Sequence, residues 1–270
     1  MRIGDRTAHC RLTRFQIVNK NGSCFSVCTF VDDLLLSLAW YTMIAAPQAD
    51  IGPFEFEGVI DAICGMAWNR LNNDEVLQVA KIYYYFSVQF RENLEIACRL
   101  RPRDTNLAAL RRDECATDNL SPWPAVAAEG EKMDHDEFMR RLLRLQPVCD
   151  EDYLTALGAN YLSRARAVDD RARAHSIASY EDGGLSRVFM AMLRMPHWYG
   201  QGQRAFRYFL KQHIQFDTGN GHGALTRCLE ADDSILPVWS AFHDLLRAGV
   251  PRLAAGGGVA DPTGAHHGEA

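Results

Sequence analysis

Three side chains able to bind a metal crowd into one short stretch, Lys211 to Gly223, KQHIQFDTGNGHG. On a helix, residues four apart lie on one face, roughly 5–6 Å apart at Cβ, so His213 and Asp217 can point at one spot. Apolar neighbours place this pair at or near the core, where a carboxylate is costly unless it is paired or coordinated. The glycines after Asp217 permit a backbone detour that would bring His222 back toward the same spot.

A second pair with the same spacing is Glu131 and His135 in AAEGEKMDHDEF, at the mouth of an amphipathic helix. Glu129 is an alternative carboxylate, and the spacing leaves the choice between Glu129 and Glu131 open. The competing interpretation is a solvated first turn, where acidic residues suit the helix dipole.

A third carboxylate, Glu181, lies in ARAHSIASYEDGGLSRVFMAML. It falls within the apolar stripe that contains Ile177 and Leu185, rather than opposite that stripe. Three helices would then offer three carboxylates and three imidazoles. Such a set, without any cysteine, favours a pair of oxygen-activating irons in a helical bundle over a zinc–thiolate site.

The elements that must position these residues are helical. Apolar spacing predicts helices at 31–46, 53–71, 72–100, 106–114, 134–146, 151–195 with breaks near Gly158 and Gly183-Gly184, 202–217, 222–230 and 235–248. No stretch between 31 and 250 alternates as a strand. Alternation around Asn21-Gly22 within residues 8–30 predicts a hairpin. We therefore expect an all-α bundle at 31–250, an N-terminal arm or hairpin at 1–30, and a disordered tail at 251–270.

The composition and net charge of the chain argue against two classes of binding partner, nucleic acid and membrane. The chain has 270 residues, 29 basic against 34 acidic side chains, and a formal net charge of -5, so nothing in the overall charge would attract nucleic acid or anionic lipid. It lacks the apolar segment of a signal peptide and any run long enough to span a bilayer. Eight cysteines without a Cys-x-x-C pair favour reduced thiols. These features predict a cytoplasmic protein that binds neither nucleic acid nor membrane.

The sequence resembles the heme-oxygenase-like diiron oxidases and oxygenases, non-heme iron enzymes with the helical fold of heme oxygenase. His213-IQF-Asp217 is similar to the family's His-x3-Asp element, and MPHWYGQGQRAFRYFLKQHIQFD to the region leading into it. The resemblance implies two Fe(II) ions and O2 as co-substrate. It implies as iron ligands Glu131, His135, Glu181, His213, Asp217 and His222.

Members of this family desaturate, cyclise, N-oxygenate or cleave amino acids and fatty acids, often in natural-product and antibiotic biosynthesis. The resemblance therefore implies a small aliphatic substrate, with a free amino acid undergoing desaturation or C–N cyclisation as our first choice. Fatty-acid oxidation and N-oxygenation would need no different ligands. Arg204 and Arg207 could clamp a substrate carboxylate, although a solvated helix face is the favoured explanation of these arginines. An external electron donor and a homodimer are compatible with this function.

Three alternatives stand beside this interpretation. Heme oxygenase itself is disfavoured, because no histidine lies between His9 and His135 where an early proximal ligand would be needed. A metal-free, thiaminase-like or cofactor-independent oxidase could use Cys149 or Cys228 as a nucleophile. A noncatalytic helical protein would place Glu131, His135, Glu181 and His213 on separate surfaces.

Overall fold

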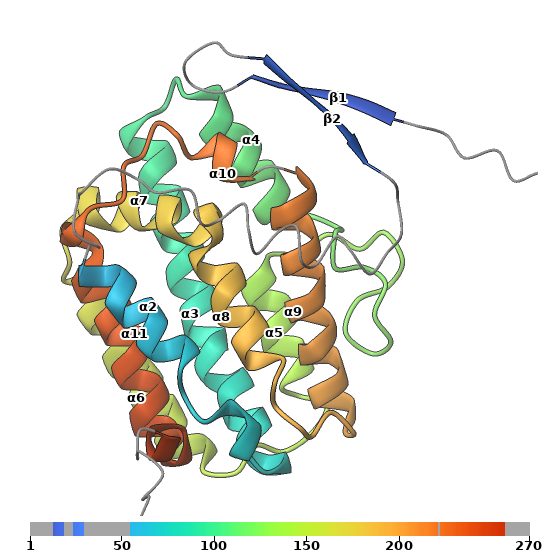
Figure 1. Ribbon diagram of the computed structural model, residues 1–270. Coiled ribbons are helices and arrows are strands. Elements are labelled where there is room, and N and C mark those ends of the chain that lie inside the picture. The colour runs from blue at the N-terminus through green and yellow to red at the C-terminus, as the bar shows by residue number, and fades with distance from the viewer. Residues whose placement is uncertain (1–12, 19–23, 30–54, 221, 257–270) are drawn as a thin grey trace, which may run out of the picture. The chain divides into compact units, whose positions relative to one another are not determined.

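The computed structural model describes residues 13–18, 24–29, 55–220 and 222–256 (Figure 1). Of 13–18, 24–29, 217–220, 222, 255 and 256, only the backbone is described. The chain divides into two compact units, Met1–Gly52 and Pro53–Ala270. The helix predicted at 31–46 lies outside the described residues.

In the first unit, β1 (Thr13–Val18) pairs antiparallel with β2 (Cys24–Thr29), with Thr13 opposite Thr29 and Val18 opposite Cys24. The two strands flank the predicted Asn21-Gly22 turn. The predicted pairing is therefore confirmed, whereas the turn residues lie outside the description.

The described part of the second unit is all-helical, as predicted. Its elements in chain order are α2 (Glu55–Cys64), η1 (Trp68–Arg70), α3 (Asn73–Leu100), α4 (Thr105–Glu114), α5 (His135–Leu142), α6 (Glu151–Arg166), α7 (Asp170–Ser179), η2 (Tyr180–Gly184), α8 (Leu185–Met192), α9 (Gln201–Asn220), α10 (His222–Leu225), η3 (Asp233–Ile235), α11 (Leu236–Gly249) and η4 (Pro251–Gly256).

Helix α3 lies in the middle of this unit and packs against α4, α5, α6, α7, α9 and α11 (Figure 1). It begins at a capping box, in which Asn72 Oδ1 accepts from the Glu75 backbone N–H at 2.9 Å and Glu75 Oε2 accepts from the Asn72 N–H at 2.7 Å. Apolar side chains recur along it at helical spacing and are buried on several sides. A helix wrapped in this way can carry side chains into the interior of the bundle.

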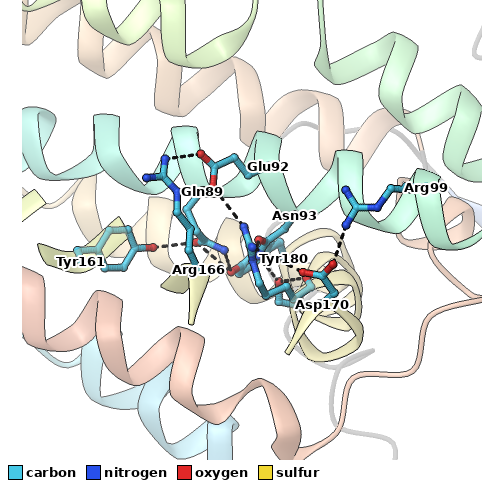
Figure 2. A network of polar contacts seen from close by, with 10 residues as sticks. Gln89, Glu92, Asn93, Arg99, Tyr161, Arg166, Asp170 and Tyr180 are labelled. Atoms are coloured by element: carbon cyan, nitrogen blue, oxygen red, sulfur yellow. Dashed lines mark hydrogen bonds and ion pairs between the residues drawn. The ribbon is translucent and has the colours of Figure 1, made fainter. Parts of the chain in front are cut away.

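A chain of buried polar groups crosses the bundle beside α3. The Tyr161 hydroxyl donates to Gln89 Oε1 at 2.7 Å, and Gln89 Nε2 donates to the Tyr180 hydroxyl at 3.2 Å. Figure 2 shows both phenols converging on Gln89, with Asn93 one turn further along the same helix. Burial raises the pKa of Tyr180 to about 12. The network therefore stays uncharged and ties α6 and η2 to α3.

The predicted break near Gly158 is wrong, whereas the break at Gly183-Gly184 is confirmed. Gly158 lies inside α6, where a Cβ atom would come within 2.2 Å of the Tyr85 ring, so close packing explains this glycine. At η2 the helix widens into a π turn, and Gly183 has a φ of 95° that suits glycine.

Several predicted ends also need correction: α2 ends at Cys64 rather than 71, α5 at Leu142 rather than 146, and α10 at Leu225 rather than 230. Helix α9 continues to Asn220, so the glycine-containing stretch after Asp217 does not end it at 217. Residues 251–256, assigned to a disordered tail from their composition, form η4. Leu253 is buried there, its carbonyl accepts from the Ala67 N–H at 3.2 Å, and Arg252 pairs with Glu75. These contacts bury apolar surface that the local composition could not reveal.

Candidate metal centre

Three buried side chains from three helices converge inside the bundle: Glu114, His135 and His213. One ligand atom from each lies within 4.8 Å of the others. His135 Nδ1 is 2.9 Å from Glu114 Oε2 and 2.9 Å from His213 Nε2. All three residues are between 6% and 7% exposed. This cluster is the only group of its kind among the described residues.

The loop 115–134 brings the first two members together. Glu114 is the last residue of α4 and His135 the first residue of α5. The loop closes on itself through an antiparallel bridge, in which Thr117 and Met133 exchange backbone hydrogen bonds of 3.1 and 2.9 Å. Asp134 Oδ1 also accepts from the Ala116 N–H at 2.8 Å. The two ligand-bearing helix ends are thus held side by side.

Helix α5 is also anchored to the central helix. Arg91 of α3 holds Asp136, the second residue of α5, through two hydrogen bonds of 2.9 and 3.1 Å. A bidentate guanidinium–carboxylate pair defines orientation as well as distance. The direction in which His135 leaves α5 is therefore restrained from two sides, by the loop and by α3.

His213 reaches the cluster from α9. Its Nδ1 lies 2.9 Å from the carbonyl oxygen of Phe209, one turn earlier, and its ring stacks on the Phe209 ring at 4.0 Å between centroids. Because a carbonyl can only accept, Nδ1 carries the proton in the neutral ring and donates it. Nε2 is then left with a lone pair facing the cluster.

A small cavity of about 10 Å³ adjoins the cluster. This is about the space that one water-sized particle needs. Glu181 of the π turn η2 lines the cavity with the three clustered residues and is itself 7% exposed. The remaining wall is mostly apolar and aromatic. It consists of Tyr83, Ser87, Phe90, Leu185 and Phe209.

This donor set fits a metal ion. Carboxylate and imidazole groups together suit iron, manganese or zinc, and metal-bound histidines usually donate their outer N–H to a carbonyl or carboxylate, as His213 does to Phe209. A buried carboxylate is also expensive without a cation or a proton nearby. The described ligands suffice for one ion.

The predicted helical pair of Glu131 and His135 is wrong, because α5 begins only at His135. Glu131 lies in the loop, about one third exposed. Its carboxylate pairs with Arg141 at 2.7 Å and accepts from the Ala128 N–H at 2.8 Å. Arg141 also donates to the Val126 carbonyl, so Glu131 helps fasten the loop to α5. Glu129 is exposed, so neither Glu129 nor Glu131 lies at the cavity.

Glu114 takes the place predicted for Glu131. The charged stretch RRDE that contains it is typical of a solvated helix end, which hides this glutamate in the sequence. A usable signal nevertheless existed: Leu107, Leu110 and Glu114 follow at i, i+3 and i+7, and all three are buried. A carboxylate that continues an apolar stripe is the same indication that singled out Glu181.

The side chains of Asp217 and His222 lie outside the description, but their helices are placed. Asp217 follows His213 by one turn on α9. Helix α10 begins at His222 and packs against α4, η2 and α9. A Cβ atom on Gly223 would be 3.2 Å from the carbonyl oxygen of Glu181. The backbone of both residues therefore runs close to the elements that carry the cluster.

Arg204 and Arg207 do not line the cavity. Both are exposed on α9; Arg204 donates to the Tyr199 carbonyl at 2.5 Å, and the Arg207 guanidinium lies 5.9 Å from the Trp198 ring centroid. A solvated helix face explains them. Their predicted role in binding a substrate carboxylate has no support from this placement.

Comparison with known proteins adds no relative: no family model, curated protein or solved structure matches this chain. Among the described residues, no helix combines the length and the apolar character needed to cross a membrane. Fold and site together define a helical protein with a buried carboxylate–imidazole cluster. What it does must be inferred from these residues.

Proposed function

We propose that this chain is a non-heme diiron, O2-dependent oxidase or oxygenase with a heme-oxygenase-like fold, acting on a small aliphatic substrate. One observation carries the proposal: Glu114, His135, Glu181 and His213, from four separate elements, line one small buried cavity in a helical bundle. Mixed carboxylate and imidazole ligands on facing helices are typical of iron sites that activate oxygen.

In the proposed centre, Glu114, His135 and His213 would hold one ion. Glu181, together with Asp217 and His222 from the two helices that adjoin the cluster, would complete the site for a second ion. Two ferrous ions would supply electrons that activate O2, and O2 would be the oxidant of an unactivated carbon. All other tasks fall to the protein.

The residues of the cavity wall indicate what the protein itself would contribute. Phe90, Leu185 and Phe209 present apolar surface beside the ligands, and such a wall excludes water that would otherwise intercept a reactive species. Tyr83 is 2% exposed, and its ring packs at 5.4 Å from the Phe209 ring. Packing of this kind keeps Phe209 in place, and the carbonyl of the same residue orients His213.

The apolar wall of the cavity favours an aliphatic group at the reacting position. With a volume of about 10 Å³, the cavity cannot enclose a substrate, so side chains must move when one enters. We propose a free amino acid, oxidised by desaturation or C–N cyclisation in a biosynthetic pathway. A fatty acid or an N-oxygenated amine is the second candidate within the same chemistry.

One form of the metal-free alternative uses Cys149 or Cys228 as a nucleophile, and neither of these thiols is activated. Nearby Asp74 raises the pKa of Cys149, and burial together with Asp104 raises the pKa of Cys228 to about 11. A reactive cysteine needs the opposite shift. The noncatalytic alternative expects separate surfaces for Glu131, His135, Glu181 and His213. Glu131 does lie apart in the loop, whereas His135, Glu181 and His213 share one cavity.

Anaerobic loading with ferrous ion tests the proposal. We expect two irons retained per chain, followed on exposure to O2 by oxygen uptake and a transient visible absorbance that depend on the substrate. Free aliphatic amino acids and fatty acids, supplied in separate reactions, would distinguish the two substrate classes by which of them triggers uptake. Retention of no iron, or oxygen uptake that no member of either class accelerates, would overturn the proposal.

A further inference from the structure

We infer that Asn119 is a positioning residue that sets the tautomer of His135, so that this ring presents Nδ1, and not Nε2, to the metal. The effect on metal binding rests on the proposed function, whereas the tautomer itself depends only on the contact between Asn119 and His135. The outward nitrogen of His135, Nε2, lies 3.2 Å from Asn119 Oδ1.

The orientation of the Asn119 amide is determined by its other end. Asn119 Nδ2 donates to the Asp113 carbonyl at 3.0 Å. Rotating the amide by 180° would put its oxygen against that carbonyl, and two acceptors would face each other. The backbone N–H of Asn119 also donates to Thr117 Oγ1 at 3.3 Å, next to the bridge that closes the loop. Oδ1 is therefore directed at His135.

An amide oxygen can only accept, so Nε2 of His135 must carry a proton. In the neutral ring Nδ1 is then the atom with the free lone pair, and this atom faces Glu114 and His213. His213 has the opposite arrangement, because its Nδ1 donates to Phe209 and its Nε2 faces inward. The two imidazoles present different nitrogens to one point.

This arrangement leaves three electron-rich atoms close together. The two imidazole nitrogens are 2.9 Å apart, and the Glu114 carboxylate oxygen is 2.9 Å from that of His135. Such a set repels itself unless a cation or a proton is shared among its members. Asn119 therefore favours the form of His135 that accepts a cation. Loss of an outer-shell partner of this kind typically costs about 10–100-fold in metal affinity.

The tautomer can be measured on the metal-free protein by nitrogen-15 NMR of the histidine side chains at about pH 8, where an ordinary imidazole is neutral. The His135→Gln variant identifies the signal. We expect the Nε2–H form of His135 in the unsubstituted chain, and loss of this preference in Asn119→Leu. A His135 ring that carries its proton on Nδ1 alone would overturn the inference.

Metal affinity supplies the second readout, with Co(II) and Fe(II) as the probes. We expect Asn119→Leu to bind each about 10–100-fold more weakly, and Asp118→Ala, at the exposed neighbouring position, to stay within about threefold of the unsubstituted chain. Unchanged far-UV circular dichroism would show that both variants fold. Equal affinity in Asn119→Leu would refute the positioning role.

The two readouts separate this inference from the proposed function. If the unsubstituted chain retains neither metal, and His135 is in the Nε2–H form there but not in Asn119→Leu, the diiron proposal fails, whereas the assignment of the tautomer to Asn119 stands. If the chain binds two irons and Asn119→Leu does so equally well, the proposed function stands and the positioning role of Asn119 fails.

Discussion

The Nε2 atom of His213 lies 2.9 Å from the Nδ1 atom of His135, although the two residues are 78 positions apart in the sequence. The contact joins the first residue of α5 to the middle of α9. Glu114, at the end of α4, contacts His135 and completes the cluster. Because each participant can bind a cation, this contact makes the cluster a candidate metal centre rather than an ordinary buried hydrogen bond.

The identity of the glutamate ligand can be tested with a matched pair of variants. We expect Glu114→Gln to lower the affinity for ferrous ion by at least about tenfold, since even an outer-shell partner is worth that much. Glu131→Gln should retain the ion, because its carboxylate is occupied by Arg141 in the loop. Iron retained after anaerobic gel filtration against a competing chelator provides the measurement. The opposite result would restore Glu131 as the ligand.

A pair of glycine variants tests the packing of α6 on α3. Gly158→Ala should destabilise the fold by about 1–3 kcal/mol, because the new methyl group would lie 2.2 Å from the Tyr85 ring. Gly58→Ala, on an exposed face of α2 with no atom within 4 Å, should stabilise by about 0.5–1 kcal/mol through helix propensity. Urea unfolding measures both. Equal effects of the two variants would show that Tyr85 does not pack on α6 as described.

The buried network around Gln89 predicts a large cost for removing its amide. Gln89→Leu leaves the buried Tyr161 hydroxyl without its partner, at about 1–3 kcal/mol for that unsatisfied group, whereas the Tyr180 hydroxyl keeps its hydrogen bond to Ser176. Arg99→Ala, which removes an exposed ion pair with Asp170 drawn in the same view (Figure 2), should cost less than about 1 kcal/mol. Thermal unfolding distinguishes them. A Gln89→Leu chain as stable as Arg99→Ala would contradict the network.

Acid stability should depend in part on Glu137. Its hydrogen bonds to Arg140 and Arg141 lower its pKa from the ordinary 4.5 to about 2. A lowered folded-state pKa means that the stabilisation is fully present above 4.5 and is lost as the pH falls toward 2. Glu137→Gln should therefore be less stable than the unsubstituted chain at neutral pH, with the difference shrinking in acid. Unfolding free energies measured across this range check the slope. A difference that does not change with pH would contradict the pairing.

Local patterns in the sequence determined much of the helical frame. The start of α3 follows from Asn72 and Glu75, which cap their own helix, and the interruption at Gly183 follows from a residue that tolerates a positive φ. His135, Glu181 and His213 each lie on or beside an apolar stripe, which predicts buried positions for them, and all three line the same cavity. Signals of this kind act over one or two turns, so they can be read along the chain.

Only the tertiary structure decided which glutamate meets these histidines. Residues 131–134 have the composition of a first helical turn, yet the bridge between Thr117 and Met133 keeps them out of the helix, and Arg141 takes the Glu131 carboxylate. The same loop brings Glu114 beside His135 across an interval that carries no helical periodicity. The physical reason is the range of the interactions: helix periodicity and capping are local, whereas loop closure and the pairing of buried charges depend on residues far apart in the sequence.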